Sequence, residues 1–338
     1  MPVLDNFSTL SSAFLPLNST IPSAQILQLS AFVHHLATTP IHPVYFPYLR
    51  LSAIHAARVT IVWAGVTRGR KQKVGRLQDL AGYLVMAWGG STLVALLLGQ
   101  PPSWLTSSAL WVVYPVVYTL LIPTGLSAYV VDTCPALLLN LIGSCSDAMT
   151  RGTTLAMLPS LVVVNPSFRH AGLWTFSLLG ALSVTGGGLL VGLFGLAEDS
   201  WKLGVPGLLR GGVLGTLDAW AAALTSIMYL ALTRHFKGTS HLADMFNLIM
   251  PEDIKTRDTT AAADPLHARA ICILFLGGLL MIRSFIIACR DQTRAVYSPP
   301  QKKAEILQEV EEKVVKSPAQ VRTNGTRKRT PKKSSRTT

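Results

Sequence analysis

Residues 89–96 read GGSTLVAL, and residues 186–193 read GGGLLVGL. The two stretches share five residues at one constant offset of 97 positions (186 − 89), beginning with a pair of glycines. The same offset carries Ser103-Trp104 onto Ser200-Trp201, so the register holds into the loop that follows each stretch. A short match alone could arise by chance, but one that continues through a loop indicates an internal repeat.

The composition is that of a membrane protein. Of the 338 residues 49% are hydrophobic and only 14% are charged, whereas a soluble domain has about 25% charged residues. No Asp, Glu, Lys or Arg occurs from Leu80 to Val131, and a soluble fold has no place for a run of this length. The chain is therefore expected to cross a membrane several times.

The apolar segments predict seven membrane-spanning helices, each close to or above the roughly 20 residues that cross a bilayer. The fourth is long enough to contain a break, and the first is unusual because it holds Arg50, His55 and Arg58. A short helix at the membrane interface is predicted before the first span, at residues 26–36. The predicted spans are residues 45–66, 80–98, 108–123, 135–164, 173–196, 206–232 and 270–289.

Positive charge sets the predicted orientation. Five Lys and Arg residues follow the first span, and the tail from Gln301 holds eleven Lys and Arg against four Glu. With seven spans this loop and this tail lie on one side, which the positive-inside rule makes the cytoplasm. The N-terminus is then luminal, which is the side that glycosylation of the acceptor triplets at Asn6 and Asn18 would require. The tail is rich in Lys, Arg, Ser, Thr and Pro, a composition typical of disorder.

The predicted fold class is an all-α membrane protein with seven transmembrane helices, made of two inverted three-helix repeats plus a seventh helix. Each copy has an odd number of crossings, so the second copy enters the membrane from the opposite face, as in many transporters and channels. The chain then divides into a luminal N-terminal segment (1–44), the first repeat (45–130), the second repeat (131–233), a luminal polar loop (234–269), the seventh helix (270–290) and a basic cytoplasmic tail (291–338).

The glycine clusters have two interpretations. Small residues let spanning helices pack closely, or consecutive glycines kink the helix and free backbone carbonyls beside a water-filled path. Their recurrence at corresponding places favours kinked second and fifth helices, where Ser91, Thr92 and Thr185 supply hydroxyls that partly replace the hydration of an ion. The predicted pore and kink residues are Gly89, Gly90, Ser91, Gly186, Gly187 and Gly188.

Six charged residues fall inside or beside predicted spans, where a charge that faces lipid is costly. Asp147 and Arg151 are four residues apart on one helix face, so they either neutralise each other or line and gate an aqueous path. Arg58 and Arg210 are expected near span ends, with their side chains reaching the headgroups. Snorkelling or a subunit contact is expected for Arg283. The six residues are Arg58, Asp147, Arg151, Arg210, Asp218 and Arg283.

No motif for catalysis, for a metal or for a cofactor is found in the sequence. His34-His35 is poorly spaced for sharing a metal from one helix face, and the acidic pair Glu252-Asp253 has no recognisable motif around it. The expectation is a protein that is not an enzyme and has no metal and no cofactor. A basic tail beside a membrane is more typical of contact with anionic lipid than with nucleic acid.

The sequence resembles the trimeric intracellular cation (TRIC) channels, from about residue 45 to residue 289. The matching stretches are Trp88-Gly89-Gly90 through Gly99-Gln100-Pro101-Pro102, Thr150-Arg151, Gly180 through Gly188, and Arg210 through Thr216. The resemblance implies a homotrimer with one potassium-permeable path in each subunit, bounded by kinked second and fifth helices. It also implies that Arg151 is a gating and inositol-lipid residue and that Arg210 is the basic residue of the sixth helix.

The resemblance has one departure. Animal members carry Lys-Glu-Val just before the fourth-helix arginine, where this chain has Asp147-Ala148-Met149, so the lysine of the inositol-lipid site is missing. The long polar segment before the seventh span is also unlike the animal pattern and suggests a divergent branch, for which a fungal origin is one interpretation. The implied function is a monovalent cation channel of the endoplasmic reticulum, nucleus or another endomembrane, which supplies counter-ion flow for calcium release and uptake. A secondary transporter and a non-conducting scaffold are the alternatives.

Overall fold

The structure, a computed structural model, describes residues 23–168, 170–235, 237–255 and 262–297. The acceptor triplets at Asn6 and Asn18 and the basic tail from residue 301 lie outside these residues. Contacts divide the chain into two units, Met1–Ile287 and Ala288–Thr338. The first unit contains the helical bundle described below.

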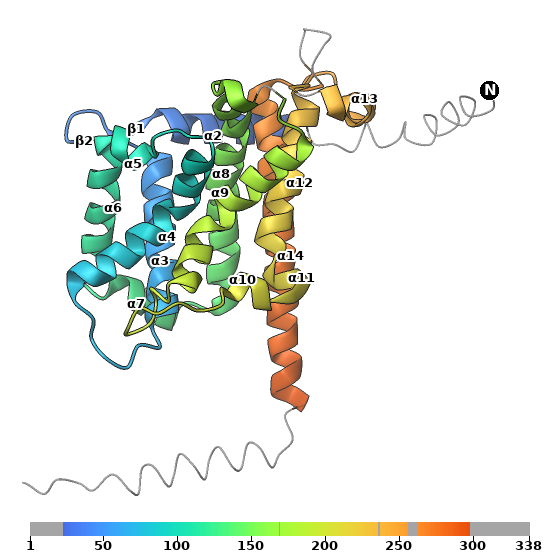
Figure 1. The fold of residues 1–338 in the computed structure, drawn as a ribbon. Coiled ribbons are helices and arrows are strands. Elements are labelled where there is room, and N and C mark those ends of the chain that lie inside the picture. Colours follow the sequence, from blue (N-terminus) through green and yellow to red (C-terminus); the bar gives the residue numbers. More distant parts are fainter. Residues whose placement is uncertain (1–22, 169, 236, 256–261, 298–338) are drawn as a thin grey trace, which may run out of the picture. The chain divides into compact units, whose positions relative to one another are not determined.

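The first part of the bundle begins with a helix across one end and a short antiparallel hairpin, followed by the first long helices (Figure 1). Helix α2 occupies the place of the predicted interfacial helix, and the hairpin takes up the first residues of the predicted first span. The elements are α2 (Ser23–Thr38), β1 (Pro40–His42), β2 (Phe46–Leu49), α3 (Arg50–Thr67), α4 (Arg76–Leu97), α5 (Ser103–Thr106), α6 (Ser108–Leu121) and α7 (Leu126–Thr133).

The second part contains the two longest helices, α8 and α14. The predicted fourth span forms the single continuous helix α8 in spite of Pro159, and the predicted polar loop contains helix α13. The elements are α8 (Ala136–Val163), η2 (Pro166–Phe168), α9 (Leu173–Leu193), α10 (Gly207–Arg210), α11 (Gly212–Gly215), α12 (Leu217–Leu232), η3 (Lys237–Thr239), α13 (Ser240–Ile249) and α14 (Pro265–Tyr297).

The described helices support a multi-pass membrane protein, but the predicted count of seven spans is not confirmed. By length and apolar composition three helices can cross a bilayer, α4, α9 and α14, or four if the bent pair α6 and α7 counts as one span. Helix α3 and helix α8 carry charged residues near their centres, and α12 has only 16 residues. The structure is nevertheless mainly helical, with one two-stranded hairpin among the described residues.

One break lies at the end of the third predicted span, and others divide the sixth predicted span. Helix α6 ends before Pro123, whose nitrogen cannot donate a helical hydrogen bond, and α7 continues at an angle of 63° after the left-handed Gly125. The sixth span divides into α10, α11 and α12, with Gly212 also in the left-handed region. Glycine is the residue that adopts this backbone conformation without strain.

The two glycine clusters meet where α4 crosses α9. A Cβ atom added to Gly89 would lie 2.9 Å from the Cα of Gly187, and one added to Gly186 would lie 2.8 Å from the Cα of Gly90. As the residue number on α4 rises, the number of the residue it meets on α9 falls, so the two helices are antiparallel. Because the contacts are also reciprocal, the helices are related by an approximate two-fold axis. Neighbouring leucines follow the same rule, because Leu190 covers Gly89 and Leu93 covers Gly186.

This crossing favours the packing interpretation of the glycines. Helices α4 and α9 each run without interruption through their cluster, so the predicted kinks are not confirmed. A Cβ at Gly90 would collide with the backbone oxygen of Ser183, and one at Gly187 would collide with that of Met86. A Cβ at Gly188 would meet no atom within 4 Å. Close contact of the two backbones therefore requires the first four glycines and does not require the fifth.

Replacing either glycine at the centre of the crossing with alanine is predicted to destabilise the bundle. The new methyl group of Gly90→Ala or Gly187→Ala must push a backbone carbonyl away, and such overpacking costs about 1–3 kcal/mol. Gly188→Ala is the matched control, since it adds the same methyl group in open space and improves helix propensity. Thermal unfolding of the purified protein in detergent measures both effects. An equal loss of stability in all three variants would contradict the packing interpretation.

Candidate functional site

A cavity of about 710 Å³ lies beside the glycine crossing. Gly90 and Ser91 of α4 and Ser183 and Gly187 of α9 form one part of its wall. Side chains of α3, α8 and α14 form much of the remainder, and α2 contributes Ala37. The cavity is thus bounded by helices from both halves of the chain and by the last helix.

Arg58 and Asp147 form a two-point ion pair across this cavity. Arg58 Nε donates to Asp147 Oδ1 at 3.1 Å, and Arg58 Nη2 donates to Asp147 Oδ2 at 3.0 Å. The approach of Arg58 to α8 depends on Gly143, where an added Cβ would lie 2.6 Å from the guanidinium carbon. Arg58 lies in the middle of α3 and is bound to α8, so the expectation that it reaches the headgroups from a span end is wrong.

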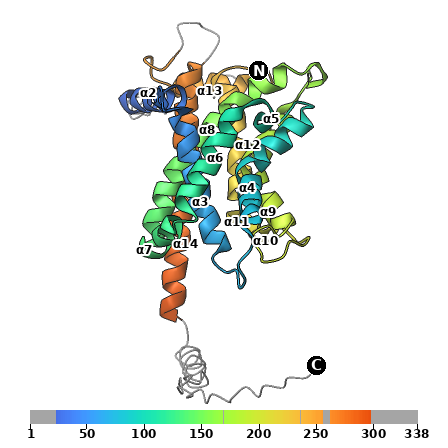
Figure 2. The ribbon, with the colours of Figure 1, turned by 90° about the vertical axis from the view of Figure 1, so that its left-hand side faces the viewer.

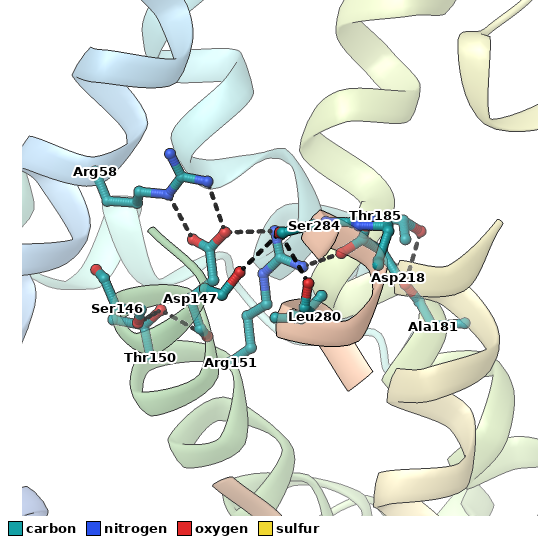
Figure 3. A network of polar contacts seen from close by, with 12 residues as sticks. Arg58, Ser146, Asp147, Thr150, Arg151, Ala181, Thr185, Asp218, Leu280 and Ser284 are labelled. Atoms are coloured by element: carbon teal, nitrogen blue, oxygen red, sulfur yellow. Dashed lines mark hydrogen bonds and ion pairs between the residues drawn. The ribbon is translucent and has the colours of Figure 1, made fainter. Parts of the chain in front are cut away.

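Three further contacts extend this pair into a network of five charged side chains, four of which are labelled in Figure 3. Arg151 Nη2 lies 3.4 Å from Asp147 Oδ2, one helical turn away, and Arg151 Nη1 donates to Asp218 Oδ1. Arg283 Nη1 donates to Asp218 Oδ2 at 2.5 Å. The structure therefore brings Asp147 and Arg151 together as predicted, but it joins them to α3, α12 and α14 as well.

In this network two aspartates are shared among three arginines. Its side chains are 11% to 24% exposed, so they are mostly withdrawn from solvent. Each aspartate contacts two arginines, which offsets part of the desolvation cost of burying the charges. Arg283 contacts Asp218 within the bundle instead of snorkelling, and the alternative of a subunit contact stays a prediction.

The hydroxyl groups predicted to act at the glycine clusters donate hydrogen bonds to backbone oxygens of their own helices. Ser91 Oγ donates to the backbone oxygen of Trp88 at 2.9 Å, and Thr92 Oγ1 donates to the same oxygen at 2.8 Å. Thr185 Oγ1 donates to Ala181 O at 2.7 Å. Of these three side chains Ser91 lines the cavity, and its oxygen retains acceptor capacity toward a cation.

Arg210 is not brought to the cavity. It is an exposed residue at the end of α10 and does not belong to the cavity wall or to the ion-pair network. The role that the resemblance implies for Arg210 therefore stays a prediction.

A second polar cluster, which the sequence analysis missed, joins α3, α4 and α6. Asp79 accepts hydrogen bonds from Trp63 Nε1 at 3.0 Å and from Tyr118 Oη at 2.5 Å, and it is also bound by Arg70. Arg70 in turn donates to the backbone oxygens of Leu196 and Ala197 beyond α9. The signal in the sequence is a single carboxylate directly before a long uncharged span, with a basic loop nearby.

His55 is a further residue of the cavity wall that the sequence analysis did not select. Its Nδ1 lies 2.6 Å from the hydroxyl oxygen of Tyr114, so the pair links α3 to α6. Within the described part of the chain no three His, Cys, Asp or Glu side chains are grouped so that they could hold a metal ion. The chemistry that this wall offers is therefore ionic and hydrogen-bonding contact with a solute.

Comparison with known proteins gives little beyond this geometry. No family model matches the chain, and no curated protein matches its sequence. Among solved structures, the crystal structure of a prokaryotic TRIC channel in 0.5 M KCl is similar, with 18% sequence identity and a TM-score of 0.41. The match covers 69% of this chain and 93% of that chain. Similarity at this level assigns no family, so the site rests on its own residues.

Removing the charge of Asp218 is predicted to destabilise the protein strongly. Asp218→Asn leaves Arg283 without its carboxylate partner and leaves Arg151 with only one of its two carboxylate partners. Breaking a buried ion pair typically costs about 3–5 kcal/mol. Asp132→Asn is the control, because Asp132 pairs with Arg68 at the surface, where an ion pair is worth about 0–1 kcal/mol. Denaturant unfolding in detergent compares the two variants. A similar loss of unfolding free energy in the two variants would show that the network is not a buried unit.

Proposed function

We propose that the protein is a potassium-permeable channel for monovalent cations in an intracellular membrane. The observation that carries this proposal is the polar cavity beside the α4–α9 crossing, inside a bundle that contains membrane-spanning helices. Charged side chains within a membrane are expensive and typically line the path of a substrate or an ion. The sequence resemblance to TRIC channels points to the same function.

The ion-pair network serves as the gate in this proposal. Guanidinium groups from α3, α8 and α14 reach into the cavity, so a cation that enters meets positive charge. Conduction then requires the arginines to move or their charge to be offset. The network joins four helices, so a shift of any one of them changes the pairing and the field along the path (Figure 3).

Counter-ion flow that balances calcium release and uptake is the proposed role, in the endoplasmic reticulum, the nucleus or another endomembrane. The proposed assembly is a homotrimer with one path in each subunit. The basic tail is proposed to contact anionic lipid on the cytoplasmic side, through its eleven Lys and Arg residues. These parts of the proposal come from the sequence and from the family that it resembles.

A secondary transporter is the alternative, and the two-fold crossing of α4 and α9 favours it. Alternating access uses two halves that are related in this way and a binding site between them. The cavity would then hold a small solute rather than pass a stream of ions.

Electrical recording from the purified protein in a planar bilayer distinguishes the two functions. A channel produces discrete current steps in asymmetric potassium chloride, with a reversal potential set by potassium. A transporter produces saturable flux without such steps, and that result would overturn the channel proposal. Absence of both would favour the scaffold interpretation.

Removing one positive charge from the cavity is predicted to increase its preference for cations. Arg58→Gln leaves Asp147 with only one arginine, so the field in the cavity becomes more negative. The reversal potential should move toward the potassium equilibrium potential, and the exposed residue Arg76 supplies the control Arg76→Gln. A shift toward chloride in Arg58→Gln, or an equal shift in both variants, would contradict this role.

The proposed orientation is tested by glycosylation. Asn6 or Asn18 should accept a glycan when the full chain is inserted into microsomes, because the N-terminus is proposed to be luminal. Asn324, in the triplet Asn324-Gly325-Thr326 of the tail, should not. Digestion with an endoglycosidase and the resulting change in mobility measure both, and a glycan on Asn324 would reverse the topology.

A further inference from the structure

Helix α13 carries three apolar side chains that are exposed along one side of the helix. They recur every third residue, and residues at this spacing are neighbours on the surface of an α-helix. Leu242, Met245 and Leu248 are 39%, 52% and 65% exposed, and these three residues are called the α13 stripe below. Single exposed apolar residues are ordinary, but a continuous row of them typically marks a contact with lipid or with another protein.

The other two sides of α13 have different surroundings. Phe246 and Ile249 pack against a buried hydrophobic cluster, so this side faces the protein. The polar side is exposed, and its residues are Ser240, Asp244 and Asn247. His241 lies beside the stripe in the first turn, and an imidazole ring can keep its polar edge at the level of lipid headgroups. One helix thus presents separate sides that suit protein, water and hydrocarbon.

The side that faces the protein fixes the level of α13 in the bundle. The cluster against which it packs includes Leu232, the last residue of α12, and Ala270 of α14. Ala270 begins an apolar run, residues 270–289, which holds one charged residue and has about the length that crosses the hydrocarbon of a bilayer. The beginning of this run therefore marks the boundary between hydrocarbon and headgroups. Helix α2 lies at the same end of the bundle as α13 (Figure 1 and Figure 2).

The charge of α13 indicates an apolar contact rather than an electrostatic one. Asp244 is the one charged residue of the helix, and it forms an ion pair with Arg234. Interfacial helices that depend on anionic lipid carry Lys and Arg on their polar side, and α13 carries neither. Lipids without net charge are therefore sufficient partners for this helix.

We propose that α13 is an interfacial helix that inserts the α13 stripe among the headgroups and upper acyl chains of the membrane. Lipid is the partner because the neighbouring helices expose apolar side chains as well, at Leu224 of α12 and at Leu266 and Leu274 of α14. Such helices typically bury their apolar side about 5–10 Å into this region. The contact anchors the ends of α12 and α14, which carry Asp218 and Arg283. This proposal does not rest on ion conduction.

Fluorescence quenching of the full-length protein in phosphatidylcholine vesicles tests the position of α13. The accessible cysteines are first replaced by serine at Cys134, Cys145 and Cys289, which leaves the buried Cys272. Met245→Cys then carries a fluorophore on the stripe. A nitroxide near the head of the lipid acyl chain should quench it more strongly than one near the chain end, and aqueous iodide should quench it weakly. Asn247→Cys is the matched control on the exposed polar side, where iodide should quench strongly and both lipids weakly.

Three results would overturn the proposal. Strong quenching by iodide at both positions would place the stripe in water. Protection of the Met245→Cys label from iodide and from both lipids would show that protein covers the stripe, as in an interface with a second copy of the chain. Stronger quenching by the nitroxide at the chain end would place the helix within the hydrocarbon.

A change of lipid charge tests the apolar character of the contact. Replacing part of the phosphatidylcholine by phosphatidylserine should leave the quenching of the Met245→Cys label unchanged, because α13 has no Lys or Arg to attract the anionic headgroup. Insertion that occurs only with phosphatidylserine would overturn the proposed apolar contact. Should Met245→Cys not fold, Leu248→Cys provides the same comparisons on the most exposed residue of the stripe.

Discussion

The contact of two backbones without intervening side chains, where α4 crosses α9, is the constraint on which the rest of the bundle depends. Gly90 and Gly187 meet backbone oxygens of the opposite helix, so no larger residue fits there without moving one of the two helices. A second glycine on each of these helices lets a side chain from a third helix approach the backbone closely. Gly82 of α4 lies under the ring of Trp63 from α3, and Gly180 of α9 lies against Ser226 from α12. Both glycine helices thus pack tightly on two sides.

The crossing also explains why the charged cavity has a stable wall. Gly90 and Gly187 line it, so at the crossing itself the wall is backbone, which cannot change by side-chain rotation. Helices α3, α8 and α14 add long arginine side chains to the wall, and these can change partners. Asp147 and Asp218 each hold two of them, and one arginine, Arg151, contacts both acids. Because the network shares its partners among four helices, small helix shifts would change which charged groups line the cavity.

Much of the helical architecture could be predicted from the sequence, because it depends on runs of apolar residues. The limits of α4, α9 and α8 agree with the predicted spans to within a few residues. The repeat was visible because its glycines meet each other, so both copies need the same small residues at the same register. The third predicted span ends at Pro123, close to the end of α6, but the break at Gly212 was missed because the pair Gly211-Gly212 stands in an apolar run that does not reveal the left-handed backbone of Gly212.

The candidate site could be predicted only where its partners are local in the sequence. Asp147 and Arg151 are one helical turn apart, so their contact follows from helix geometry. The partners Arg58 and Arg283 lie 89 residues before and 65 residues after the acids that they bind, and such pairing depends on tertiary packing.

The charged residues of the cavity wall are four arginines and one aspartate, so in the proposed channel this positive excess would oppose a cation that enters. One unpaired guanidinium at about 4 Å from a monovalent cation opposes it by about 4 kcal/mol at an effective dielectric constant of 20. That energy corresponds to about a thousandfold in the rate of crossing. In the proposed channel, rearrangement of the Arg58, Arg151 and Arg283 contacts would change this opposition by moving helices, since each of these contacts joins two helices. Pairing within the network would therefore act on the barrier to the proposed crossing.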